Sequence, residues 1–341
     1  MKKSVTSYLK DYMMVIVLIA IYAIFCILGP IVAGRSFFTL PNFLTMINQN
    51  AYLIIIGVGI TFIMLGGGMD LSTGYIISTV CVSMALISNS VNTGVAVVVG
   101  ILLATLLSAF NGVMYSWLKV FPFIITLATQ YVLNGVTYLL TGGMSKTNYV
   151  PTAFKYIGGF NISIGNTALK TAVLVMIVMV AIGSFILNKT YFGRNVYALG
   201  SNPDAVALSG VSVAKMRIAV FAVAGLFFGI AAVVSVGSSG GAVNQGLGVG
   251  TEFTVMAGAM LGGVKMGGGG GKMSNMVIGV LIIGLLNYGM TFLNLNQYWQ
   301  YVVLGIVLLA AVIMDTMQTR AAENAAKKVT GVAPGTPKVA K

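Results

Sequence analysis

The sequence predicts an all-helical protein that crosses a membrane about ten times, with broken helices and a short additional helix outside the membrane. Hydrophobic residues make up 58% of its 341 positions and charged residues only 7%, whereas soluble domains contain about a quarter charged residues. The apolar residues lie in long blocks, such as Met13–Leu28 and Ala172–Leu187. Each block is close to the roughly 20 residues that a helix needs to cross the hydrocarbon core. Because backbone groups in lipid must be paired, and the blocks do not alternate as barrel strands do, the spans are helices.

Apolar runs separated by Gly, Pro and charged residues give the expected spans in chain order. The ten spans are Tyr12–Gly29, Phe43–Leu65, Leu71–Ile87, Val95–Leu118, Phe123–Thr141, Leu169–Leu187, Ile218–Gly237, Phe253–Val264, Met276–Leu293 and Tyr298–Met314. The eighth is short and rich in glycine. The chain is therefore divided into an N-terminal segment, residues 1–11, a membrane domain, residues 12–316, and a tail, residues 317–341. The tail consists largely of Ala, Lys, Pro and Gly, a composition typical of disorder.

The basic residues predict how the chain is oriented in the membrane. If the N-terminus is cytoplasmic, four of the 19 Lys and Arg residues lie on the far side, namely Arg35, Lys146, Lys155 and Lys170. The other 15 are then cytoplasmic, as the positive-inside rule predicts. We therefore expect a multi-pass protein of the plasma (inner) membrane with both termini in the cytoplasm. This orientation explains the net charge of +13, and no basic cluster typical of nucleic-acid binding is visible.

Residue types that carry enzyme chemistry are scarce. Histidine, the commonest general base and zinc ligand, is absent. Cys26 and Cys81 lie inside apolar blocks, without the spacing of a metal site or a disulfide. The glycine run Gly267–Gly271 resembles a phosphate-binding loop, but Met266 replaces the first required glycine and Met273 follows the lysine. We expect no catalytic residue, metal or cofactor, and no ATP hydrolysis by this chain itself.

The longest predicted cytoplasmic connection, residues 188–217, contains a short helix. Asn202 offers a capping side chain, Pro203 suits the first helical position, and Asp204 places an acid in the first turn. Such a short helix is marginal alone in water, so we expect it to pack against another protein. The residues assigned to this contact are Asn202, Pro203, Asp204, Ala205, Leu208, Ser209 and Gly210.

A translocation path is expected near helix breaks and polar residues inside the membrane. Gly66–Gly68 and Gly262–Gly263 each follow a Met-Leu pair and indicate broken helices. Asp70 is either an acid that neutralises a helix dipole or a charge beside the path. Amide and aromatic side chains suit an uncharged, hydroxyl-rich substrate, although interhelical bonding and interfacial anchoring are alternatives. The candidates are Gly67, Gly68, Asp70, Ser72, Asn111, Gln130, Asn287 and Trp299.

Four segments together resemble one family, the permease subunits of ATP-binding cassette importers for ribose, xylose, galactose and related sugars. Gly67–Gly74 is similar to the family's G-G-x-D-L-S-x-G, and Pro122–Thr129 to its P-F-I-x-T-L-A-T. The other two segments are residues 188–211 and Ile282–Asp315, and both look closest to the galactose type. The chain departs from the pattern after Glu252, where the family usually has Leu-Asp-Ala-Ile-Ala-Ala and this chain has Phe-Thr-Val-Met.

The resemblance implies a transport function. A monosaccharide would be delivered by an extracytoplasmic binding protein and would cross by alternating access between two permease chains, identical or different. Separate cytoplasmic ATP-binding subunits would supply the energy through the short helix of residues 203–209. The alternative is a stand-alone secondary transporter of a small polar solute, which the scarcity of intramembrane charges disfavours.

Overall fold

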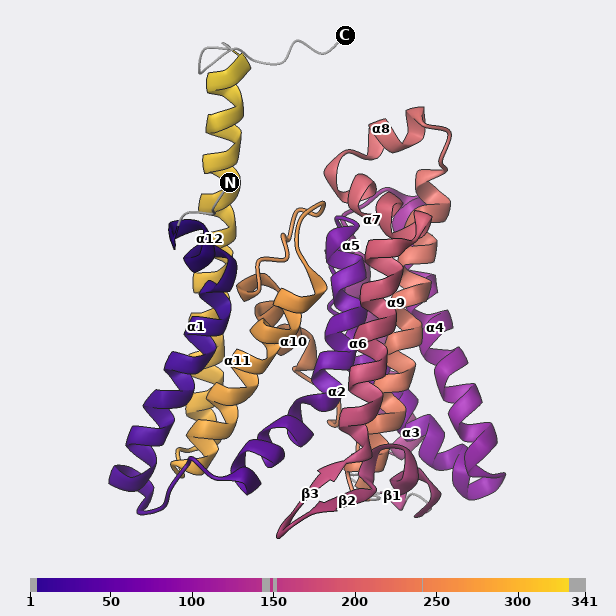
Figure 1. Cartoon of the computed structure of the whole chain (residues 1–341). Helices are drawn as coiled ribbons and strands as arrows, with labels where there is room; N and C mark the ends of the chain where they lie inside the picture. The colour runs from indigo at the N-terminus through magenta and orange to yellow at the C-terminus, as the bar shows by residue number, and fades with distance from the viewer. Residues whose placement is uncertain (1–4, 143–147, 150–151, 241, 331–341) are drawn as a thin grey trace.

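The protein is a bundle of long helices (Figure 1). The computed structural model describes residues 5–142, 148–149, 152–240 and 242–330. Within these residues, nine helices are long and apolar enough to cross a membrane. The predicted helical, polytopic fold is confirmed, and the chain is a multi-pass membrane protein.

The helices alternate with short irregular segments. The α-helices are α1 (Val5–Leu28), α2 (Leu40–Leu65), α3 (Thr73–Ser90), α4 (Thr93–Leu118), α5 (Pro122–Thr141), α6 (Thr171–Lys189), α7 (Tyr191–Ser201), α8 (Pro203–Leu208), α9 (Val213–Ser238), α10 (Thr251–Leu261), α11 (Met273–Phe292) and α12 (Gln297–Thr330). Two short segments, η1 (Gly29–Ala33) and η3 (Lys155–Gly159), are π-helical. One, η2 (Thr152–Phe154), is a 3-10 helix. Strand β1 (Asn148–Tyr149) pairs antiparallel with β4 (Ala242–Val243), and β2 (Asn161–Ile164) with β3 (Thr167–Lys170).

Side-chain caps set several helix starts. Thr39 Oγ1 accepts a hydrogen bond from Asn42 N at α2, and Asn92 Oδ1 accepts one from Val95 N at α4. These bonds satisfy donors that the first helical turn leaves unpaired. Helices α2 and α4 therefore begin where the sequence places Thr39 and Asn92 after a break.

The main core contains buried residues of α2, α3, α4, α6, α9, α10 and the first half of α11, and α1 and α12 stand at one side of it (Figure 1). In α9, a side chain at Gly225 or Gly229 would lie 2.7 Å from the Cα atom of Thr105 or Ile101, respectively, in α4. Small residues at this spacing allow two membrane helices to approach closely. In the most hydrophobic stretch of each helix, 72% of the residues are buried in α2, compared with 11% in α1 and 6% in α12. Most side chains in these stretches of α1 and α12 therefore lie on the outside of the bundle.

Three boundaries differ from the sequence expectation. The predicted eighth span corresponds to α10, whose 11 residues cover only about 16 Å of the roughly 30 Å hydrocarbon core. An irregular segment, residues 244–250, leads into it, so this crossing is a broken one. Helix α1 already begins at Val5, within the segment predicted as an N-terminal extension, and α12 continues to Thr330, into the predicted tail. The rest of that tail, residues 331–341, lies outside the described residues.

The molecule has two distinct ends (Figure 1). The strand end carries β2, β3 and the first residues of α2 and α6. The α8 end carries α7, α8 and the loop of residues 262–272. Helix α1 begins and α12 ends toward the α8 end.

Candidate functional site

The first helix break lies between α2 and α3. Gly66 N donates to Phe62 O at 3.0 Å, and Gly68 N donates to Ile63 O at 2.9 Å. Between them, Gly67 has a φ of +77°, a conformation that glycine adopts without strain. The chain therefore turns sharply here and brings Asp70 and Ser72 into the core.

Asp70 anchors a buried polar network that joins three helices. Its Oδ1 accepts hydrogen bonds from Ser72 N at 2.8 Å and from Ser72 Oγ at 2.6 Å. Asn111 Nδ2 of α4 donates to Ser72 Oγ at 2.8 Å, and Thr129 Oγ1 of α5 donates to Asn111 Oδ1 at 2.7 Å. Asp70, Ser72 and Asn111 are each 0% exposed. The structure thus brings three of the predicted path residues together, and Asp70 Oδ2 has no hydrogen-bond partner in the described chain.

The second helix break is the irregular segment before α10, and it contacts the start of α3, just after the first break. Glu252 is 1% exposed, and its Oε2 accepts a hydrogen bond from Gly250 N at 3.1 Å. A side chain on Gly74 of α3 would overlap both the Glu252 carboxyl group and the carbonyl of Gly248. Glu252 therefore contacts the start of α3, which begins three residues after Asp70. Acids are rare and costly within membrane-spanning segments, so two buried acids at two adjoining breaks make this region a candidate functional site.

The other predicted path residues lie elsewhere. Gln130 of α5 is half-buried, and its Oε1 has no hydrogen-bond partner in the described chain. Asn287 lies in the second half of α11 and Trp299 at the start of α12, both beside the main core, and Trp299 is 58% exposed. These two residues do not join the Asp70 network.

Gly67 belongs to a contact at the α8 end that we call the glycine junction: Gly67, Gly200 of α7 and Gly268. A side chain on Gly268 would lie 2.7 Å from the Cα atom of Gly200 and 2.8 Å from that of Gly67. A side chain on Gly200 would overlap the Leu65 carbonyl, and this carbonyl accepts a hydrogen bond from Gly269 N at 2.9 Å. Three backbones therefore pack directly on one another. The glycine run Gly267–Gly271 is visible in the sequence. Its likeness to a phosphate-binding loop, however, does not indicate that these glycines pack against other backbone segments.

The expected short helix is present as α8. Asn202 Oδ1 caps it, accepting hydrogen bonds from Asp204 N at 3.0 Å and Ala205 N at 3.1 Å. Pro203 occupies the first turn. The side chain of Val206 is 3% exposed, whereas that of Leu208 is 90% exposed. A large apolar side chain is thus presented on a capped helix.

Two polar pockets lie at opposite ends. The strand-end pocket has a volume of about 490 Å³, and its lining includes Asn48, Gln49, Tyr52, Lys170, Ser235 and Ser238. The α8-end pocket has a volume of about 540 Å³, and its lining includes Gly67, Tyr115, Ser116, Lys119 and Arg217. The buried carboxyl network lies in the core near the two helix breaks.

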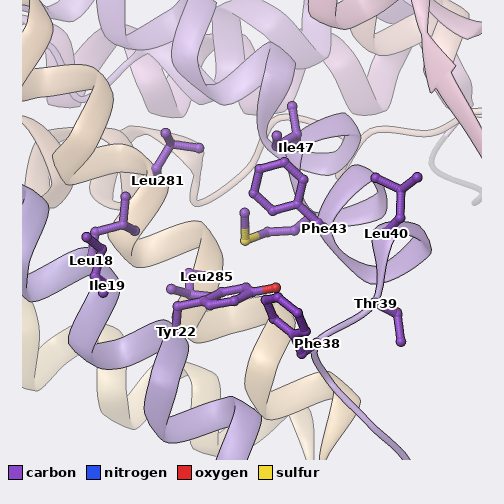
Figure 2. A pocket seen from close by; sticks show the side chains of 11 residues that line it. Leu18, Ile19, Tyr22, Phe38, Thr39, Leu40, Phe43, Ile47, Leu281 and Leu285 are labelled. Atoms are coloured by element: carbon purple, nitrogen blue, oxygen red, sulfur yellow. The ribbon is translucent and has the colours of Figure 1, made fainter.

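A third pocket, of about 620 Å³, is apolar and lies between α1, α2 and α11 (Figure 2). Leu18, Phe43 and Leu285 are among the side chains that surround it, and of its lining only Tyr22 and Thr39 carry a side-chain oxygen. Such a lining suits lipid chains rather than a polar solute.

The chain resembles known import permeases along most of its length. The family described as "Branched-chain amino acid transport system / permease component" matches residues 42–312. The galactose/methyl galactoside import permease protein of Escherichia coli (strain K12) is 30% identical over 93% of this chain and 97% of that protein. The ribose import permease protein of the same strain is 32% identical over 91% of this chain and 94% of that protein. The ribose import permease protein of Haemophilus influenzae is 33% identical over 88% and 91%, respectively. No solved structure matches the chain.

Proposed function

The chain belongs to the family described as the permease component of branched-chain amino acid transport systems, and from this membership we propose that it is the membrane permease subunit of an ATP-driven monosaccharide importer. The observation that carries the proposal is the similarity, over nearly the whole of both chains, to import permeases for galactose and ribose. The role is that of a permease rather than an enzyme. Its partners are ATP-binding subunits, a sugar-binding protein and a second permease chain.

The α8 end is the proposed contact with the ATP-binding subunits. The contact residues are Asn202, Pro203, Asp204, Ala205, Leu208, Ser209 and Gly210. Leu208 supports this assignment, because an apolar side chain that is 90% exposed on a capped helix is suited to a hydrophobic pocket on a partner. Since Gly200 packs on the Leu65 carbonyl, movement of α7 and α8 is transmitted to the first helix break. We propose that this contact couples ATP hydrolysis to opening of the path.

The distribution of basic residues supports a cytoplasmic α8 end. Among the side chains described, those at or near the α8 end are Lys119, Lys189, Arg194, Lys215, Arg217, Lys265 and Lys272. Arg35, Lys155 and Lys170 lie at the strand end, and Lys146 lies outside the described residues. By the positive-inside rule the α8 end, where α1 begins and α12 ends, faces the cytoplasm. The strand end then faces the sugar-binding protein.

The second permease chain is proposed to pack against α5. Tyr131 lies near the middle of this span and is 70% exposed, and Leu139 is 82% exposed. Tyrosine in membrane proteins favours the interfaces, so a mid-span tyrosine needs a protein partner or water. Gln130, with its unpaired Oε1, lies beside it. We assign the translocation path to this face and to the adjoining Asp70 and Glu252 region.

Reconstitution tests the proposal. The permease, its ATP-binding subunits and its binding protein are placed in lipid vesicles, and uptake of labelled galactose, ribose and leucine is measured with and without ATP. We expect ATP-dependent uptake of a sugar and none of leucine. Uptake of leucine instead would overturn the substrate class. Uptake by the permease alone, abolished by an uncoupler at constant ATP, would establish the secondary-transporter alternative.

A further inference from the structure

The strand-end pocket contains both fixed and free polar groups. Asn48 is fixed, since its Nδ2 donates to Ala168 O at 3.0 Å and its Oδ1 accepts from Lys170 N at 2.9 Å. In contrast, the Gln49 amide, the Tyr52 hydroxyl and the Ser235 hydroxyl form no hydrogen bond with the described part of the chain. Ser235 is only 5% exposed. Gln49 is exposed and Tyr52 is partly buried, so Ser235 is the buried one of the three. A buried polar group without a partner in the described chain is suited to bind a polar ligand.

The free groups match a neutral polyol. One amide and two hydroxyls supply both donors and acceptors, and the Tyr52 ring supplies an apolar face for the carbon atoms of a sugar. None of the residues lining the pocket is an acid. An amino acid ligand would leave its ammonium group without a carboxylate, at a high desolvation cost. Lys170 is the single cation in the lining, and its Nζ lies 3.4 Å from Ser238 O.

The segment that leads into α10 contributes to the wall of the pocket. Leu247 lines the pocket. Its neighbour Gly248 packs against the Gly74 carbonyl, and the Gly248 carbonyl accepts a hydrogen bond from Thr251 Oγ1 at 2.6 Å. On the same segment, the Gln245 carbonyl accepts a hydrogen bond from Ser78 Oγ. Residues 244–250 therefore connect the pocket wall to α3 and, through Gly250 N, to the Glu252 carboxyl group.

We propose that the strand-end pocket is a binding site for a neutral monosaccharide within the permease itself, and that residues 244–250 form its inner gate. This inference rests on the proposed function and deepens it, because it places the first permease contact of the delivered sugar between α2 and α9. The volume of about 490 Å³ lies within the range of small-molecule sites. Free groups on α2 and α9 hold the sugar until the segment moves away from Gly74.

Protection of a cysteine from chemical modification tests the site. Ser239, which lines the pocket, is replaced in a chain carrying Cys26→Ser and Cys81→Ala, giving Ser239→Cys. The complex in lipid nanodiscs is treated with a charged methanethiosulfonate reagent, with or without galactose, ribose or leucine. At a sugar concentration about ten times the Kd, we expect an imported sugar to slow modification about tenfold. Leucine leaves the rate unchanged. The matched control, Ser163→Cys on the exposed strand β2, is unaffected by every solute.

A second variant tests the free groups. Adding Gln49→Ala to Ser239→Cys raises the sugar concentration needed for half-protection about two- to tenfold, as expected for one lost hydrogen bond. If an imported sugar gives no protection of Ser239→Cys in a preparation with normal ATP-dependent uptake, the pocket proposal is wrong and the importer function stands. If sugar is neither imported nor protective, the proposed function itself fails. Protection by leucine alone would overturn the substrate class.

Discussion

The two ends of the molecule are built in different ways. At the strand end, polar side chains from α2, β3 and α9 surround an open pocket, and three of them have hydrogen-bonding groups without a partner in the described chain. At the α8 end, Gly67, Gly200 and Gly268 bring three backbone segments into direct contact. Side chains that surround a space can accept a ligand, whereas backbones in direct contact move together. The difference supports the two proposals, solute recognition at the strand end and transmission of force at the α8 end.

The largest expected effect is at the glycine junction. Gly200→Val places a branched side chain against the Leu65 carbonyl and Gly268. Because backbone, rather than a flexible side chain, is in the way, we expect a cost of roughly 3 kcal/mol and complete loss of uptake. Thermal unfolding in detergent and vesicle uptake measure the two effects.

Gly267→Ala is the matched control in the same loop. No heavy atom lies within 4 Å of the position of an added side chain there. We expect uptake and thermal stability close to those of the unmodified chain. Equal damage from both substitutions would contradict direct backbone packing at the junction.

The next effect concerns α8. Leu208→Asp places a charge where an apolar contact is proposed, and because Leu208 is 90% exposed the permease itself should fold normally. Loss of about 2 kcal/mol of apolar contact lowers stimulation of the ATP-binding subunits by roughly tenfold or more. ATP hydrolysis by the assembled complex is the measurement. Leu208→Met should retain at least half of the activity, and unchanged hydrolysis by Leu208→Asp would refute the assigned contact.

A smaller effect is expected in the buried network between the two ends. Asn111→Ala leaves Ser72 Oγ without its donor and Thr129 Oγ1 without its acceptor. Losing these partners costs about 1–3 kcal/mol of the free energy of unfolding. Thermal unfolding measures this loss, and we expect slower uptake with it. Asn188→Ala, which removes an exposed amide bonded to Ser184, serves as a control with little effect.

The smallest effect is expected at the strand end. Tyr52→Phe removes one hydroxyl from the pocket without disturbing any bond within the described chain. We expect the KM for sugar uptake to rise about two- to tenfold, with thermal stability and the maximal rate unchanged. An altered maximal rate at constant KM would show that Tyr52 acts on the transport step rather than on binding.

Much of the fold could be predicted from the sequence, because composition alone requires helices in lipid. The short helix α8 was also predictable, since Asn202, Pro203 and Asp204 carry local capping information. The glycine junction could not be predicted, because Gly67, Gly200 and Gly268 are far apart in the sequence and only the folded chain brings them together. Asn48 and Gln49 are recognisable in the sequence as polar residues within a span, but the remaining lining of the strand-end pocket could not be predicted, for a related reason. Lys170 and Ser238 lie at helix ends, where polar residues are common whether or not they line a site.

Dependence of sugar uptake on the ATP-binding subunits tests the central claim most directly. Vesicles containing the permease, the ATP-binding subunits and the binding protein are compared with vesicles containing the permease alone, at the same sugar gradient. We predict accumulation of galactose or ribose only in the complete system and only with ATP. Accumulation by the permease alone would contradict the account.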